Sequence, residues 1–211
     1  MRSELKKRII TSILLLIMLI LMSFYTYVLI VSLIIIGIIS WIEFYALISK
    51  IYKKSNYNNI VLRFILKASS LLYLSYLVFI IIISKLNLPD FYILIIYIIS
   101  ISIMTDIGGL IVGKIFKGKK LTRISPNKTI SGSIGSFVFS LFLIPFFSTF
   151  LTSQVNMSFF GIILITLSIS FISQLGDLFI SLIKRKANVK NTSDLLPGHG
   201  GILDRIDGII F

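Results

Sequence analysis

Six apolar runs of helix length follow one another along the chain, with short polar segments between them. A helix needs about 20 apolar residues to cross the hydrocarbon core of a bilayer. The pattern therefore predicts six membrane-spanning helices, a polar tail at 184–201 and a short apolar segment at 202–211. The predicted spans cover residues 9–24, 25–48, 61–83, 91–112, 134–151 and 159–183.

The basic residues predict the orientation of these helices. Basic tracts at 2–8, 50–54, 114–128 and 184–190 all fall on one side of the membrane if the six spans are counted in order. Lysine and arginine accumulate in cytoplasmic loops. We therefore expect a multi-pass protein of the cell inner (cytoplasmic) membrane, with its N-terminus in the cytoplasm.

Composition supports this fold class and narrows the function. Of the 211 residues, 56% are apolar and only 14% are charged, which excludes a soluble globular or disordered chain. The net charge of +13 is explained by loop topology and by attraction to anionic lipid headgroups. We therefore expect no nucleic-acid partner. The absence of cysteine excludes disulfides and thiolate chemistry. The predicted fold is an all-α, polytopic helical bundle forming one membrane domain over residues 1–211.

The eight acidic residues are unevenly placed. A carboxylate inside a membrane span is costly and usually faces a cavity where it has a function. Asp106 and Asp177 lie late in predicted spans, toward the cytoplasmic end, and Asp194, Asp204 and Asp207 follow in the tail on the same side. The alternative to a functional site is that such a carboxylate only forms an ion pair with a lysine, so that the two charges neutralise each other. The remaining acids, Glu4, Glu43 and Asp90, are interpreted as ordinary.

Carboxylates and basic residues on one side of a membrane suggest phosphate chemistry. Carboxylates hold Mg²⁺, whereas lysine and arginine hold phosphates, and together they catalyse phosphoryl and nucleotidyl transfer. Asp177, Ser181, Lys184 and Arg185 share one helix face by their spacing. We expect them to line a polar cavity that faces the cytoplasm.

Two turns also point to phosphate binding. Ser125-Pro126 introduces a turn before Lys128 and a helix start, where exposed backbone N–H groups can bind an anion. Residues 197–201 read Pro-Gly-His-Gly-Gly, a sharp loop that contains His199, the only histidine. His199 is interpreted either as a solvated side chain or as a substrate contact. Gly109 and Gly113, four residues apart, are typical of close helix packing.

These segments resemble one family. One set of residues near the end of the chain is similar to the signature of the phosphatidate cytidylyltransferases, or CDP-diglyceride synthases. The set comprises Ser181-Leu-Ile-Lys184-Arg185, then Lys190, then residues 197–207 (PGHGGILDRID). The segment from Asp106 to Thr129 resembles a second block of that family. The resemblance covers residues 100–211 by motif, so residues 101–211 are the expected catalytic region and 1–100 supply packing spans.

The resemblance implies a reaction. CTP and phosphatidate would give CDP-diacylglycerol and pyrophosphate with Mg²⁺ as cofactor, in a protein that forms a homodimer. It implies metal binding by Asp177, Asp204 and Asp207, with Lys184, Arg185 and Arg205 also catalytic. The expected substrate-binding residues are Asp106, Ser125, Lys128, Ser181, Lys190, His199, Gly200 and Gly201.

Two positions depart from the family pattern. Asn191 stands where an acid is usual, and Ser131 stands where glutamate or another polar residue is common. We predict that Asn191 does not replace an essential metal ligand, because three acids remain. The alternatives are a CTP-dependent transferase acting on another lipid phosphate, an inactive membrane homologue, and a small transporter.

Overall fold

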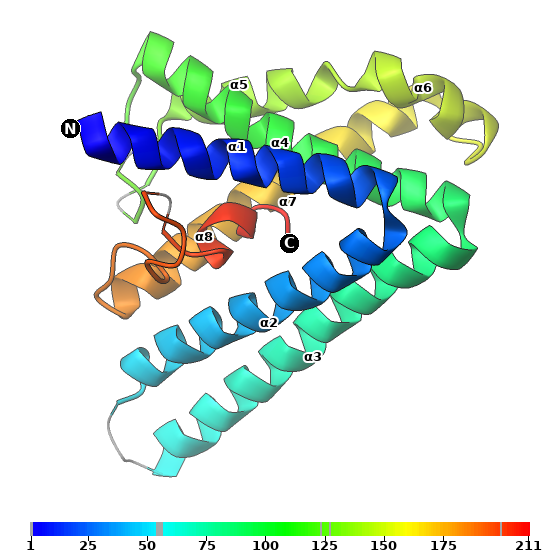
Figure 1. The fold of residues 1–211 in the computed structure, drawn as a ribbon. Helices are drawn as coiled ribbons and strands as arrows, with labels where there is room; N and C mark the ends of the chain where they lie inside the picture. Colours follow the sequence, from blue (N-terminus) through cyan, green and yellow to red (C-terminus); the bar gives the residue numbers. More distant parts are fainter. Residues whose placement is uncertain (1, 54–56, 123, 127, 199) are drawn as a thin grey trace. The chain divides into compact units, whose positions relative to one another are not determined.

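The computed structural model describes residues 2–53, 57–122, 124–126, 128–198 and 200–211, with side chains from residue 10 onward except that of residue 12. These residues form α-helices joined by loops, with two isolated β-bridges and no strand among the described segments (Figure 1). The predicted all-α class is confirmed. The chain divides into two compact units, which are described separately below.

Unit 1 comprises residues 1–87 and 183–206. It contains α1 (Arg2–Phe24), α2 (Thr26–Ile51), α3 (Tyr57–Asn87) and the short α8 (Leu203–Ile206). In Figure 1, α2 and α3 run side by side as an antiparallel hairpin. The indole Nε1 of Trp41 on α2 donates to the backbone oxygen of Lys67 on α3 (3.1 Å), which ties the two helices together.

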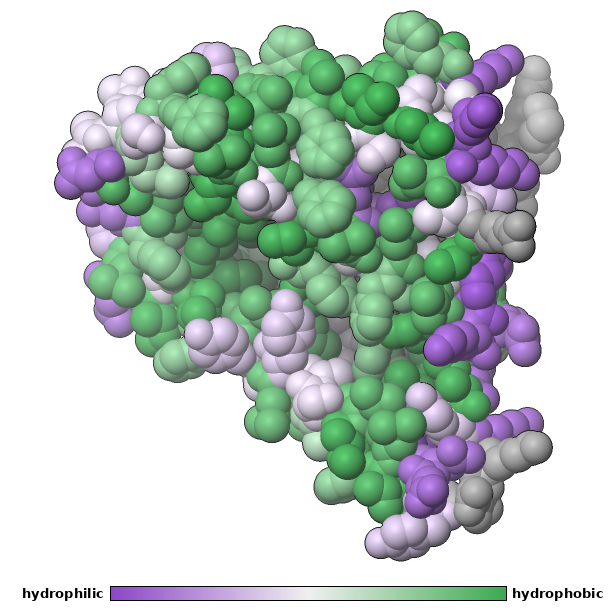
Figure 2. All heavy atoms as spheres, turned by 180° about the vertical axis from the view of Figure 1, so that it is seen from behind, coloured by the Kyte–Doolittle hydropathy of each residue, from purple (hydrophilic) through white to green (hydrophobic). Residues whose placement is uncertain are grey.

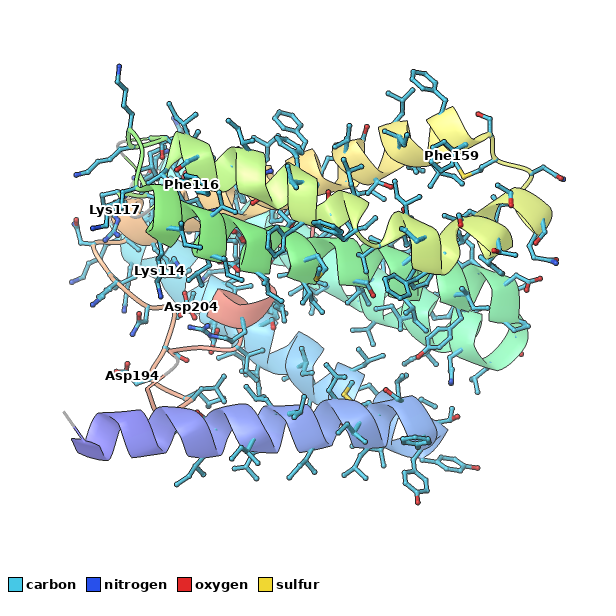
Figure 3. All side chains as sticks on the ribbon, turned by 90° about the horizontal axis from the view of Figure 1, so that it is seen from above. Lys114, Phe116, Lys117, Phe159, Asp194 and Asp204 are labelled. Atoms are coloured by element: carbon cyan, nitrogen blue, oxygen red, sulfur yellow. The ribbon has the colours of Figure 1, made fainter. Side chains whose placement is uncertain are left out.

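Unit 2 comprises residues 88–182 and 207–211. It contains α4 (Pro89–Phe116), α5 (Ile130–Leu141), α6 (Ile144–Ser153) and most of α7 (Phe159–Lys186). In Figure 3, Lys114, Phe116 and Lys117 lie together at one end of this unit, and Phe159 lies at the other. Its apolar core is formed by Tyr97, Ile101, Ile144, Leu151 and Ile162.

Four helices, α2, α3, α4 and α7, are long and apolar enough to cross a membrane. Their surfaces carry large apolar side chains, as shown by the exposure of Leu72 (70%) and Phe160 (68%). Figure 2 shows apolar side chains over most of the visible face, with the hydrophilic ones in separate patches. This surface suits lipid rather than water.

The first predicted span lies within α1, whose described apolar part is Ile13–Phe24. The fifth predicted span differs from the prediction. The fifth span, predicted as one helix over 134–151, is instead two helices, α5 and α6, bent by 52°. Pro145 lies in the first turn of α6. Its ring has no N–H to donate and clashes with the carbonyl four residues earlier, which explains the break. The described residues thus contain four candidate spans, or five if α5 and α6 count as one.

Glycines bring α4 and α5 into close contact, as the spacing of Gly109 and Gly113 predicted. A Cβ on Gly108 would lie 2.6 Å from the backbone oxygen of Gly135, and one on Gly132 would lie 2.7 Å from that of Gly109. Backbones can approach this closely only where side chains are absent. The Ser136 hydroxyl, which donates to the backbone oxygen of Thr105 (2.7 Å), reinforces the contact.

The replacement Gly108→Ala should destabilise unit 2 by about 1–3 kcal/mol, because the new methyl group would overpack the α4–α5 contact. Thermal unfolding of the purified chain in detergent, followed by circular dichroism, measures the loss. Gly161→Ala is the matched control, since its Cβ would meet only Ser158 Oγ (3.2 Å) and Met157 Cε (4.0 Å). Equal stability of the two variants would contradict the packing role.

Candidate active site

The polar residues form two clusters, one in each unit. The Asp204 cluster, in unit 1, consists of Glu43, Lys184, Thr192, Ser193 and Asp204. The Asp177 cluster, in unit 2, consists of Lys128, Ser173, Asp177 and Gly208. Both clusters use α7, which carries Asp177 and Lys184 seven residues apart.

Asp204 organises the loop that precedes α8. Its Oδ1 accepts a hydrogen bond from Lys184 Nζ (2.7 Å). Its Oδ2 accepts from Thr192 N (2.8 Å), Thr192 Oγ1 (3.0 Å) and Gly201 N (3.0 Å). The Lys184 and Asp204 side chains are only 14% and 6% exposed. Loss of either partner would leave a buried charge uncompensated, which typically costs about 3–5 kcal/mol.

These contacts also set the protonation state of Asp204. Burial raises the pKa of its carboxyl group, but hydrogen bonds from Lys184, Thr192 and Gly201 outweigh burial. The net result is a pKa below the ordinary value for aspartate. The carboxyl group of Asp204 is therefore ionised at neutral pH.

Glu43 is a member of the Asp204 cluster that the sequence interpretation missed, as it missed Thr192 and Ser193. Predicted as ordinary, it is only 4% exposed on α2. Each of its carboxylate oxygens accepts one hydroxyl and one backbone N–H. Oε1 accepts from Ser193 Oγ (2.6 Å) and Ile202 N (3.0 Å). Oε2 accepts from Thr192 Oγ1 (2.8 Å) and Leu203 N (2.8 Å).

The signal for Glu43 was already present in the chain. It is a carboxylate within an apolar run, and the same criterion selected Asp106 and Asp177. Because Glu43 lies on α2, a helix near the N-terminus holds the loop that precedes α8 near the C-terminus. Sequence spacing cannot reveal such a contact.

Three glycines give this loop its shape. Gly198 and Gly200 have φ values of 79° and 82°, a left-handed conformation that glycine adopts without strain. A Cβ on Gly201 would lie 2.5 Å from both Glu43 carboxylate oxygens. Gly200 and Leu196 exchange backbone hydrogen bonds (2.8 and 3.1 Å), which close the turn. The predicted sharp loop is thus confirmed for its described residues; His199 lies outside them.

The Asp177 cluster contains a carboxylate oxygen that is available for a ligand. Oδ2 of Asp177 accepts from Lys128 Nζ (2.6 Å). Oδ1 is buried and has no hydrogen-bond partner among the described residues, and neither has Ser173 Oγ. A Cβ on Gly208 would lie 2.8 Å from Ser173 Oγ and 3.0 Å from Asp177 Oδ1. Two unsatisfied buried oxygens next to a glycine are unusual and call for an explanation.

Lys128 reaches Asp177 from the turn predicted to bind phosphate. Its backbone N–H donates to the Ser125 oxygen (3.1 Å), which closes that turn. Thr129 caps the N-terminus of α5 by accepting from Gly132 N (3.0 Å). Ser131, at the position that departs from the family pattern, lies within 3.1 Å of Thr129 Oγ1.

The remaining predicted site residues differ in exposure. Ser181, on α7, and Asp207, directly after α8, are partly buried. Oδ1 of Asp207 accepts a hydrogen bond from the backbone N–H of Gly208 (3.2 Å), a residue of the Asp177 cluster. Asn191 is exposed and lies beside Gly200. A Cβ added to Gly200 would lie 3.3 Å from Cγ of Asn191. Figure 3 shows Asp204 on α8, and Asp194 on the loop before it. The exposed predicted site residues are Asp106, Arg185, Lys190 and Arg205.

Few carboxylates in the two clusters could bind a metal ion. No group of three or more histidine, cysteine or acidic residues is arranged to hold a metal within the described part of the chain. Mg²⁺ commonly uses one or two carboxylates and takes its other ligands from water and substrate phosphates. Oδ1 of Asp177 suits such a site. Asp204 could offer only Oδ1, because its Oδ2 already has three donors.

Comparison with known proteins agrees with these motifs. A profile of the Cytidylyltransferase family matches residues 2–211. A phosphatidate cytidylyltransferase of Bacillus subtilis (strain 168) is 45% identical over 108 residues, which are 51% of this chain and 39% of the relative. Its namesake from Staphylococcus aureus (strain COL) is 42% identical over 118 residues, 56% of this chain and 45% of the relative. The chain thus matches less than half of each relative's length.

The replacement Glu43→Gln should destabilise the purified chain by about 1–3 kcal/mol. A glutamine amide can accept at only one end, so its NH₂ group would face either Ile202 N–H or Leu203 N–H. Thermal unfolding in detergent measures the effect. Ile42→Leu, at the neighbouring exposed position, serves as control and should change stability by less than about 0.5 kcal/mol. Unchanged stability of Glu43→Gln would refute the anchoring role.

The stability that Asp204 provides should depend on pH. Its folded-state pKa is lowered, whereas an unfolded aspartate has a pKa of about 3.9. The contribution is therefore complete above about pH 5 and is lost as the pH falls through the folded-state value. Melting temperatures of wild type and Asp204→Asn should differ at pH 7 and converge toward pH 3. A constant difference across this range would show that the ionised carboxylate is not what stabilises the loop.

Proposed function

The chain belongs to the cytidylyltransferase family, and on that basis we propose that it transfers CMP from CTP to phosphatidate. The products are CDP-diacylglycerol and pyrophosphate. The name shared by the curated relatives supports phosphatidate as acceptor. The observation that carries the proposal is Asp177, a partly buried carboxylate. Its Oδ2 is bound to Lys128, and its buried Oδ1 is unsatisfied among the described residues.

The reaction is a displacement at phosphorus. A phosphate oxygen of phosphatidate forms a bond to the α-phosphorus of CTP, the bond from that phosphorus to the bridging oxygen breaks, and pyrophosphate leaves. A phosphate monoester is already largely ionised near neutral pH, so no general base is needed. This chemistry requires mainly positioning and neutralisation of negative charge.

The two clusters supply groups for these tasks. Mg²⁺, when bound, would neutralise the phosphates and orient them, and the free oxygen of Asp177 is the first candidate to hold it. Asp207 and Oδ1 of Asp204 are further candidates. Lys128 and Lys184, each now paired with a carboxylate, can donate to phosphate oxygens once substrates arrive.

The lipid substrate sets where the reaction takes place. Phosphatidate resides in the bilayer and CTP in the cytosol, so the reacting groups belong at the cytoplasmic membrane surface. The basic tracts favour that orientation, with the N-terminus inside the cell. The family resemblance also supports a homodimer.

Membranes that contain the chain should incorporate label from radiolabelled CTP into lipid only when phosphatidate and Mg²⁺ are both present. Phosphatidate is compared with an isoprenoid phosphate in the same assay. If only the isoprenoid phosphate is labelled, the proposed acceptor is wrong, but the proposed CTP-dependent transferase activity stands. Absence of label with either acceptor, in correctly inserted protein, would refute the proposal.

The replacement Asp177→Asn should reduce turnover at least about a hundredfold. This reduction is larger than that expected from loss of a residue that only orients a metal ligand. Asp90→Asn is the matched control, because Asp90 is exposed in the first turn of α4. Activity of Asp177→Asn within about threefold of wild type, at equal protein level, would exclude Asp177 as an essential ligand.

A further inference from the structure

A cavity of about 590 Å³ lies between α2 and α3 in unit 1, and it shares no residue with the Asp204 cluster. Its lining combines two basic side chains with aromatic and apolar ones, and no acid is among the residues that line it. The residues that define the cavity chemically are Trp41, Tyr45, Ser49, Arg63, Phe64 and Lys67.

Lys67 is held in place by uncharged groups. Its Nζ donates to Ser49 Oγ (2.6 Å) and lies 3.2 Å from the centroid of the Tyr45 ring. The ring and the hydroxyl fix the ammonium group, but neither carries a negative charge. Within the described part of the chain, no carboxylate forms an ion pair with Lys67 at the cavity wall.

Arg63 adds a second charge on the same helix face, four residues before Lys67. No described residue accepts a hydrogen bond from its guanidinium group or forms an ion pair with it. The cavity therefore has two positive charges and no carboxylate in its lining. Two such cations can bind one phosphate group from two sides.

The location of the cavity points to a lipid. Lys67 lies ten residues into α3, about 15 Å from its start, on a helix apolar enough to span a membrane. Trp41 and Tyr45 suit the level of the lipid headgroups, where aromatic side chains concentrate. Leu71 continues the wall toward the apolar part of α3, where an acyl chain would lie.

We propose that this cavity binds an anionic membrane phospholipid, with its phosphate between Arg63 and Lys67. The site is separate from the proposed catalytic residues and does not depend on the proposed function. The lack of carboxylates in the lining argues against a metal–nucleotide complex as the occupant, because such a complex needs ligands for the metal.

The single tryptophan of the chain makes the site directly observable, because Trp41 lines the cavity. The full chain is reconstituted in phosphatidylcholine nanodiscs that contain a small fraction of lipid with brominated acyl chains, which quench tryptophan fluorescence on contact. Brominated phosphatidylglycerol should quench Trp41 at a mole fraction at least tenfold lower than brominated phosphatidylcholine does. Equal quenching by the two lipids would overturn the proposal.

Variants tie the preference to the two cations. Arg63→Gln should reduce the preference for the anionic lipid several-fold, and the double variant Arg63→Gln/Lys67→Gln should abolish it. Lys50→Gln removes an exposed charge from the last turn of α2, outside the cavity, and should retain the full preference. A preference that persists in Arg63→Gln, or that is lost equally in Lys50→Gln, would show that general surface charge attracts the lipid.

A soluble phosphate ester tests whether the cavity binds a free phosphate ester instead of a lipid. Glycerol 3-phosphate in millimolar excess should not displace the brominated anionic lipid, because it lacks the acyl chains that contact the apolar wall. Displacement by glycerol 3-phosphate would show that the cavity binds a free phosphate ester and would overturn the lipid assignment.

Discussion

The arrangement of this chain depends on the requirement that a carboxylate in an apolar helical environment be paired. Glu43 meets it with four hydrogen bonds, and Asp204 meets it with Lys184, Thr192 and Gly201. In satisfying these acids the chain brings α2, the end of α7 and the glycine-rich loop together within unit 1. Asp177 satisfies one oxygen and leaves the other available. The contrast separates Glu43 and Asp204, which hold the loop of unit 1, from Asp177, which can bind a ligand in unit 2.

Hydropathy predicted the helices well because apolar length is a property of single segments. Asp177, Lys184 and Asp204, which the sequence motifs predicted as catalytic residues, lie in the two polar clusters, and their catalytic and metal-binding roles stay predictions. The bend between α5 and α6 was missed although its cause, Pro145, is visible in the sequence, because an average over an apolar run ignores a single residue. Pairings such as Lys128 with Asp177, 49 residues apart, depend on how helices pack and have no signal in local spacing.

The glycines show that one residue type serves two physical purposes in this fold. Gly108 and Gly132 allow helix backbones to approach in unit 2, whereas Gly198 and Gly200 allow a left-handed turn in unit 1. Both purposes serve the polar clusters. The close α4–α5 contact supports the helix start beyond Lys128, and the turn presents backbone N–H groups to Asp204 and Glu43.

The contacts of Glu43 also have a consequence for biosynthesis. Its partner Thr192 lies 149 residues later in the chain, so α2 leaves the ribosome long before the loop exists. At a synthesis rate of about 5–20 residues per second, the delay is roughly 7–30 s. During that interval the carboxylate of Glu43 lacks the four donors that it has in the folded chain. Final closure of unit 1 is therefore a step that follows the synthesis of α2, and the appearance of residues 192–203 determines when it can occur.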